Sequence, residues 1–176
     1  MSAYTHPAYR EEKEHLDRTL KAVDAELTLA ETEKQSAEAE LKYARAFDPD
    51  KLPIREILFV KAVQTEKNMV LAHRKPYFTR INFTERGKGE RVYYIGKYGV
   101  MDSSSLESVV IDWRAPLANL YYSGQLGHVE YTAPDGAVSG EMTIKRQFEI
   151  LDGEIRSIFD TDIVSQDASL QSALNA

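Results

Sequence analysis

The two carboxylates best placed for binding chemistry are Asp48 and Asp50, in the segment Phe47-Asp-Pro-Asp-Lys-Leu-Pro53. Pro49 and Pro53 cannot continue a helix, and each biases the residue before it toward an extended conformation, so this segment is predicted to be an exposed turn. Two carboxylates in such a turn can meet a cation or a basic surface. The alternative is that Asp, Pro and Lys serve only to form the turn and to cap the helix that follows.

A second polar group lies in the densest apolar stretch of the chain, from Ser108 to Tyr122, which contains the only tryptophan. Asp112, Trp113 and Arg114 stand just before Pro116, where the chain is expected to bend or to leave a sheet. Because buried charges are normally paired, Asp112 and Arg114 are expected to form a partly buried corner. The corner is either purely structural or a docking point for another domain.

Patterns that would support catalysis are absent from the sequence. Gly96-Lys97 comes nearest to a phosphate-binding loop, but Tyr98 follows it and the first glycine of that motif is missing. There is no cysteine and no Gly-x-Ser-x-Gly element. Four histidines are scattered and form no metal-binding pair: His6, His15, His73 and His128. The sequence therefore predicts no catalytic, cofactor or metal site in these residues.

The composition is that of a soluble globular protein, with 43% apolar and 28% charged residues. No stretch approaches the roughly 18 consecutive apolar residues that a membrane span requires, and the first residues form no secretory signal. The net charge of −6 repels nucleic-acid phosphate, so autonomous binding to DNA or RNA is not expected. A cytoplasmic protein without membrane contact is therefore predicted.

Residues 10–46 are predicted to form one long helix, because they contain no glycine or proline and are rich in Glu, Lys, Ala and Leu. Residues 54–74 are predicted to form a second helix that folds back on the first as an antiparallel coiled-coil hairpin. Residues 1–50 hold 7 Lys and Arg against 12 Asp and Glu, whereas residues 51–75 hold 6 against 2, so opposite charges favour the pairing. The first helix carries a heptad seam of Leu16, Leu20, Val23, Leu27, Ala30, Ala37, Leu41 and Ala44.

The two predicted helices differ in length. At 1.5 Å per residue the first is about 55 Å long and the second about 31 Å. The first turns of the longer helix are therefore expected to pack against the domain that follows, or against a part of the protein outside these residues.

From Pro76 the composition changes to Tyr, Phe, Ile, Val, Thr and Gly. Strands are predicted at residues 77–84, 91–98, 108–112, 117–122, 127–133, 140–150 and 154–159, with hairpin turns at 86–89, 134–136 and 152–153. These short connections predict an antiparallel β meander, curled or barrel-like. The expected fold class is α+β, with a helical hairpin arm over residues 1–75, a β domain over 76–160 and the start of a further helix over 161–176.

Five motifs are spaced through the β region: Pro76-Tyr-Phe-Thr-Arg-Ile-Asn-Phe83, Tyr94-Ile-Gly96, Ile111-Asp-Trp-Arg-Ala-Pro116 followed by Leu120-Tyr-Tyr122, Gly140-Glu-Met-Thr-Ile-Lys-Arg-Gln-Phe148, and Phe159-Asp-Thr-Asp162. Together they resemble the N-terminal region of the HelD family. This family comprises UvrD/Rep-like superfamily-one helicase ATPases, similar to DNA helicase IV, that bind bacterial RNA polymerase.

The resemblance implies that the arm, led by Asp48 and Asp50, enters the polymerase secondary channel during the recycling of transcription complexes. It also implies that ATPase domains using ATP and Mg follow further along the chain, so that these residues do not hydrolyse ATP alone. The alternative is a coiled-coil and β-domain adaptor that acts as a passive protein-interaction scaffold with no motor. An independent hydrolase built on the β domain has the least support.

Overall fold

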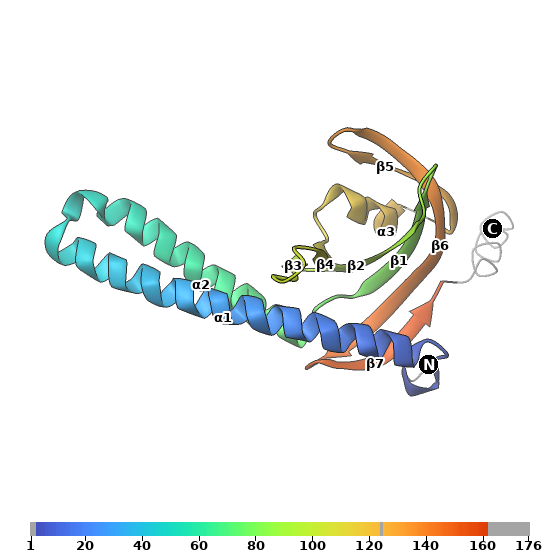
Figure 1. Ribbon diagram of the computed structural model, residues 1–176, viewed down its shortest axis with the longest axis horizontal. Coiled ribbons are helices and arrows are strands. Elements are labelled where there is room, and N and C mark those ends of the chain that lie inside the picture. The colour runs from blue at the N-terminus through green and yellow to red at the C-terminus, as the bar shows by residue number, and fades with distance from the viewer. Residues whose placement is uncertain (1–2, 124, 162–176) are drawn as a thin grey trace, which may run out of the picture.

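Two long helices project from a β-sheet in the computed structural model, which describes residues 3–123 and 125–161 (Figure 1). Helix α1 (Tyr9–Phe47) and helix α2 (Leu52–Arg74) contact each other and are joined by a short 3-10 helix, η2 (Pro49–Lys51). Another 3-10 helix, η1 (Ala3–Thr5), precedes them. The predicted helical hairpin is therefore confirmed. The further helix predicted for residues 161–176 lies, beyond Thr161, outside the described residues.

The arm, defined as α1 and α2 with their connection, is held by a small apolar seam and by ion pairs between the helices. Ala30, Leu41 and Ala44 of α1 are buried, and the alanines allow a close approach of the two backbones. Lys34 lies 2.5 Å from Glu66, and Arg55 pairs with Glu40. These pairs confirm the antiparallel arrangement, although partly exposed ion pairs contribute only about 0 to 1 kcal/mol each. None of the helices in the described part of the chain is long and apolar enough to cross a membrane.

The first turns of α1 extend past the end of α2 and pack on the sheet, as predicted from the unequal lengths (Figure 1). Leu16 and Val23 are fully buried there. The heptad seam therefore has two partners along its length, the sheet in its first half and α2 in its second.

Within the described residues the sheet has seven strands: β1 (Thr79–Glu85), β2 (Glu90–Gly96), β3 (Val100–Met101), β4 (Ser108–Asp112), β5 (Gly127–Ala133), β6 (Gly136–Leu151) and β7 (Glu154–Asp160). Their order across the sheet is β3-β4-β2-β1-β6-β5, and β7 also pairs with β6. β6 has 16 residues, which allow it to pair with β1 on one side and with both β5 and β7 on the other.

The sheet is open and mixed, so the predicted curled or barrel-like meander is wrong. β4 pairs with β2 in parallel, with Ile95 opposite Ile111 and Gly96 opposite Asp112. Parallel neighbours need a long connection, which residues 97–107 supply. The short spacing between the predicted strands favoured an antiparallel hairpin at this point. Instead, β3 pairs with β4 and not with β2, and β4 then runs parallel to β2.

The strand predicted at residues 117–122 is also wrong. This segment forms a 3-10 helix, η3 (Pro116–Ala118), and a short helix, α3 (Asn119–Ser123). Pro116 stands in the first turn of η3, where its missing N–H costs nothing and its fixed φ favours a helix. Ala118 and Leu120 are fully buried, so the segment packs on the sheet without joining it.

Helices cover both faces of the sheet, which explains why it need not close. On one face, residues of α1 and α2 pack against strand residues: Leu16, Val23, Met69 and Ala72 against Tyr94, Phe148, Ile150 and Ile158. On the other face, η3 and α3 pack against a second cluster: Ala118 and Leu120 against Ile81, Phe83, Ile95 and Met142. An irregularity in the β1–β6 pairing at Asn82 and Phe83 shifts the register between β1 and β6.

The predicted hairpin turns are confirmed. Asp152 and Gly153 join β6 to β7 with φ values of 52° and 75°, the signs that a type I′ turn requires at both central positions. Gly87, between β1 and β2, and Gly136, at the start of β6, also have positive φ values.

Substituting Leu41 with Asp places an unpaired charge in the seam between α1 and α2, and we expect it to destabilise the arm by about 3 kcal/mol or more. Leu41 is 5% exposed, whereas Leu29 on the same helix is 56% exposed, so Leu29→Asp is the matched control and should change stability little. Circular dichroism and amide hydrogen exchange measure the effect. Equal exchange protection of α2 in wild type and Leu41→Asp would contradict the seam.

Candidate functional site

One buried carboxylate, that of Glu12 near the start of α1, joins the arm to the sheet. Glu12 is 0% exposed. Its Oε1 accepts hydrogen bonds from Arg80 Nη1 of β1 at 2.7 Å and from Arg146 Nη1 of β6 at 2.6 Å. Its Oε2 accepts one from the hydroxyl of Tyr94 on β2 at 2.9 Å. Three strands therefore converge on a single side chain of α1.

The two arginines of this cluster have further acidic or amide partners. Arg80 also donates to Glu11 at 2.7 Å and to Asn82 at 2.9 Å. Arg146 makes two bonds to the carboxylate of Asp160, at 2.6 and 3.0 Å. Burial opposes the charge of Arg146, but the bonds to Asp160 and Glu12 raise its pKa above the ordinary value. Likewise, burial acts to raise the pKa of Asp160, but Arg146 outweighs burial and the pKa is lowered.

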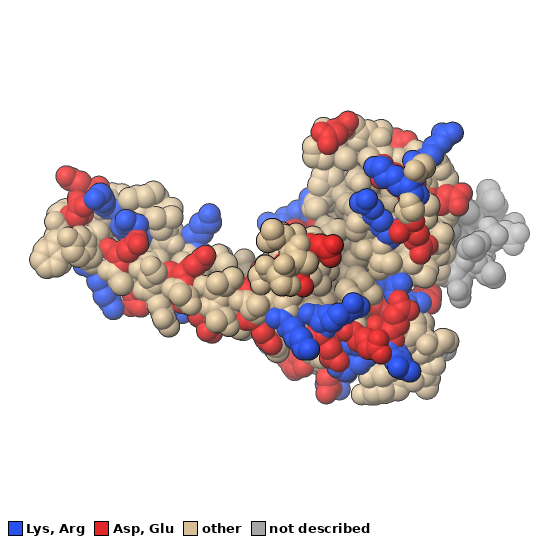
Figure 2. Space-filling model, in the orientation of Figure 1, with Lys and Arg blue, Asp and Glu red and all other residues tan. Residues whose placement is uncertain are grey.

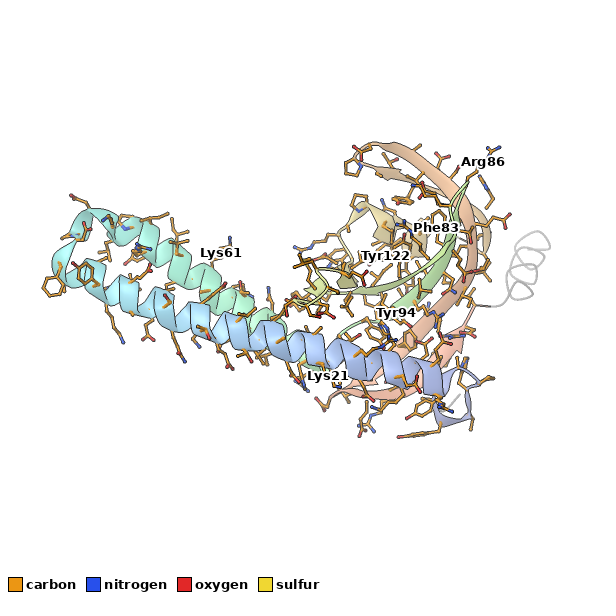
Figure 3. The ribbon with its side chains drawn as sticks, in the orientation of Figure 1. Lys21, Lys61, Phe83, Arg86, Tyr94 and Tyr122 are labelled. Carbon is orange, nitrogen blue, oxygen red and sulfur yellow. The ribbon has the colours of Figure 1, made fainter. Side chains whose placement is uncertain are left out.

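Aromatic rings pack beside this cluster under α1. His15 stacks on Tyr94, with ring centroids 3.5 Å apart and planes 9° from parallel. Figure 3 shows Tyr94 lying between its strand and α1. Burial, followed by the charges of Arg18 and Arg80, lowers the pKa of His15 to about 4. His15 is therefore neutral in the folded protein near pH 7. Burial and the nearby Glu12 carboxylate raise the pKa of Tyr94 above its ordinary value.

The tip of the arm is where Asp48 and Asp50 were predicted, and the structure places both there. Asp48 follows the last residue of α1, and its carboxylate lies 2.7 Å from the Lys51 ammonium. Asp50 is exposed and has no ion-pair partner within the described residues. Asp48 therefore closes the turn, whereas Asp50 is the freer charge.

The distal arm also carries exposed apolar side chains, which the sequence reasoning missed. Tyr43 and Phe47 of α1 are 62% and 75% exposed, and their ring centroids lie 5.2 Å apart. Ile57 and Val60 of α2 are 63% and 66% exposed. Figure 2 shows basic and acidic residues interspersed along the arm with other residues between them. Contiguous exposed apolar side chains with charged residues around them are typical of protein interaction sites, and Tyr43 and Phe47 are in contact. The sequence signal that could have revealed these exposed side chains is the apolar face of the second helix, which is broader than contact with a single partner helix requires.

The predicted pairing of Asp112 with Arg114 is present, but the expected partial burial holds only for Asp112, because the Arg114 side chain is exposed. Arg114 makes two side-chain bonds to Asp112, at 2.9 and 2.6 Å, and its backbone N–H donates to the same carboxylate at 2.8 Å. These bonds lower the pKa of Asp112. Trp113 is 44% exposed and contacts Tyr122 edge to face. The backbone N–H of Trp113 also donates to the carbonyl of Gly96, which fixes the corner to the end of β2.

The tip and the corner are separate surfaces, one at the far end of the arm and the other on the sheet. Among the residues that the structure describes, no group of three or more His, Cys, Asp or Glu is arranged to hold a metal ion. Both surfaces combine exposed apolar side chains with charged groups, most of which are paired. Such an arrangement suits recognition of another protein.

Comparison with known families gives one match that covers most of the chain. The model described as "DNA helicase IV HelD, N-terminal domain" matches residues 9–173. No curated protein matches the chain.

Replacing Glu12 with Gln leaves two arginines buried without their shared counter-charge, and we expect a loss of about 3 to 5 kcal/mol in the free energy of unfolding. Glu11→Gln is the matched control, because Glu11 also pairs with Arg80 but its side chain is 63% exposed. The control should cost about 1 kcal/mol or less. Urea denaturation compares the two variants. Equal losses in the free energy of unfolding for the two variants would mean that the buried position of Glu12 adds nothing to stability.

The pKa of His15 predicts a loss of stability on acidification. Unfolded His15 takes up its proton near pH 6.5, but the folded residue does so only near pH 4. Between these values the unfolded state binds more protons, so lowering the pH from 6.5 to 4 should destabilise the fold by up to about 3 kcal/mol. Chemical denaturation across this range measures the slope. His15→Gln should flatten it, and an unchanged slope in that variant would exclude His15 as its source.

Proposed function

Because the chain belongs to the HelD N-terminal domain family, we propose that it is the RNA-polymerase-binding region of a HelD-like helicase ATPase that acts in the recycling of transcription complexes. In this proposal the arm inserts into the secondary channel of the polymerase. ATP and Mg are bound by ATPase domains elsewhere in the protein. The protein acts in the cytoplasm, without membrane contact and without autonomous nucleic-acid binding by these residues.

The observation that carries the proposal is the form of the arm. α1 has 39 residues and α2 has 23, which correspond to about 58 Å and about 35 Å. Beyond the sheet the two helices pack only on each other among the described elements (Figure 1). A slender two-helix projection can enter a pore that a globular surface cannot reach.

Two kinds of side chain at the tip contribute to binding in different ways. Phe47 and Ile57 supply apolar area whose removal from water stabilises a complex, as anchor residues do in protein interfaces. Asp50, and Asp48 to a lesser degree because of Lys51, can approach basic groups or a bound Mg²⁺ in the partner. Such charges mainly raise the association rate.

The corner of Asp112, Trp113 and Arg114 is the proposed docking point for the protein's own ATPase domains. The exposed indole offers apolar area, and Asp112 fixes the guanidinium of Arg114 beside it. Trp is enriched among residues that dominate interface energies. A passive scaffold would use the same two surfaces, but its polymerase binding would not respond to ATP.

In the full-length protein, we expect Phe47→Ser with Ile57→Ser to weaken polymerase binding at least tenfold, mostly through faster dissociation. Asp48→Asn with Asp50→Asn should weaken binding less, through slower association that is most evident at low salt. Surface plasmon resonance with bacterial RNA polymerase separates the two rates.

The control for both variants is Leu106→Ser, which removes an equally exposed apolar side chain from the sheet domain. It should bind the polymerase as the wild type does. Unchanged binding by both tip variants would overturn the insertion proposal. Equal losses in the Leu106 control would place the contact on the sheet instead.

A further inference from the structure

A half-open pocket of about 540 Å³ lies where the end of α2 meets the sheet. Its apolar lining comes from four segments: Leu71, Phe78, Tyr98, Phe148, Ile150 and Leu151. Leu71 and Leu151 are 45% and 37% exposed, so part of this lining is in contact with water. The volume is within the range of pockets that enclose a ligand or the side chains of a peptide.

Hydrogen bonds on two sides hold the pocket in shape. The Arg74 side chain donates to Asp152 at 2.8 Å, and the backbone N–H of Gly153 donates to the carbonyl of Arg74 at 3.4 Å, which ties α2 to the β6–β7 turn. Phe78 bonds through its backbone to both Ile95 and Phe148, each at 2.9 Å. The pocket is therefore formed before any ligand arrives, which reduces the entropy lost on binding.

The rim of the pocket is basic although the chain as a whole carries a net charge of −6. Arg74, Lys75 and Lys97 line it, against Glu149 as the one acidic lining residue. Arg74 is engaged with Asp152. Within the described part of the chain, neither Lys75 nor Lys97 forms an ion pair within 4 Å, although the charge of Lys75 contributes, after that of Arg74, to lowering the pKa of Asp152. The ammonium of Lys97 lies 5.6 Å from the centre of the Tyr98 ring.

From this apolar floor and basic rim we propose that the pocket binds a peptide segment of a partner protein, in which an apolar side chain is flanked by carboxylates. The apolar side chain packs against the exposed parts of Leu71 and Leu151. The carboxylates pair with Lys75 and Lys97. The site is at the opposite end of the arm from its tip, so it is independent of the proposed insertion into the polymerase.

Single-stranded nucleic acid fits this pocket less well. Proteins bind it with a groove of exposed aromatic faces on which successive bases stack. Here Tyr77 and Phe148 are only 2% and 7% exposed and contact each other edge to face. Phe78 is partly buried and packs edge to face on Tyr121, and the ammonium of Lys97 lies over the Tyr98 ring, so the pocket lining does not present a row of free aromatic faces.

The test is a titration of the ¹⁵N-labelled 176-residue chain with the probe peptide acetyl-Glu-Asp-Phe-Leu-Asp-amide, followed by amide chemical shifts. We expect saturable shifts confined to residues 71–78, 97–98 and 148–151, with an affinity that falls as salt is raised. Lys75→Gln with Lys97→Gln should weaken binding about fivefold or more, by the loss of two complementary charges.

Two controls make the result specific. Lys61→Gln with Lys67→Gln removes the same charge from exposed positions on α2, of which Lys61 points away from the arm in Figure 3, and it should bind as the wild type does. The neutral peptide acetyl-Gln-Asn-Phe-Leu-Asn-amide should bind more weakly. The proposal is overturned by shifts that map elsewhere, by no shifts at millimolar peptide, by tighter binding of a short oligothymidine, or by self-association of the chain through this pocket.

Discussion

The structure depends on the hydrogen bonds between the Glu12 carboxylate of α1 and the guanidinium groups of Arg80 and Arg146. A carboxylate that is 0% exposed is stable only when its charge and its lone pairs are matched, and here three strands supply the donors. Because α1 is a single helix of 39 residues, fixing its first turns fixes the direction of everything beyond them. The position of the arm tip is therefore set at the sheet.

The two ends of the arm differ in how far their apolar side chains are buried. Near the sheet, Leu16 and Val23 are fully buried and stabilise the fold. At the tip, Phe47 and Ile57 are more than half exposed. Their exposed apolar surface does not stabilise the isolated chain and is available to a partner. A fixed base and an uncovered tip reduce the entropy lost on binding, since the arm does not have to be ordered first. These features support the proposed binding of the arm to a large assembly.

The sequence predicted the features that depend on local pattern. The two helices, their hairpin and the Asp152-Gly153 turn follow from residue types at adjacent positions, and so does the pairing of Asp112 with Arg114. The parallel return of β4 and the helical conformation of residues 116–123 depend on long-range packing, which local spacing does not encode. The Glu12 cluster was missed for the same reason, since Glu12 is 68 residues from Arg80 in the sequence. Its sheet partners Arg80, Tyr94 and Arg146 nevertheless lie within the motifs that resemble HelD.

The most direct test of this account is site-specific photocrosslinking of the full-length protein in complex with bacterial RNA polymerase. The photoreactive amino acid p-benzoylphenylalanine would replace either Phe47 at the arm tip or Leu106 on the sheet domain, two positions that are each 75% exposed. We expect the probe at position 47 to crosslink to polymerase residues that line the secondary channel, and the probe at position 106 not to do so. Crosslinks to the channel from position 106 alone, or none from position 47 in a verified complex, would contradict the account.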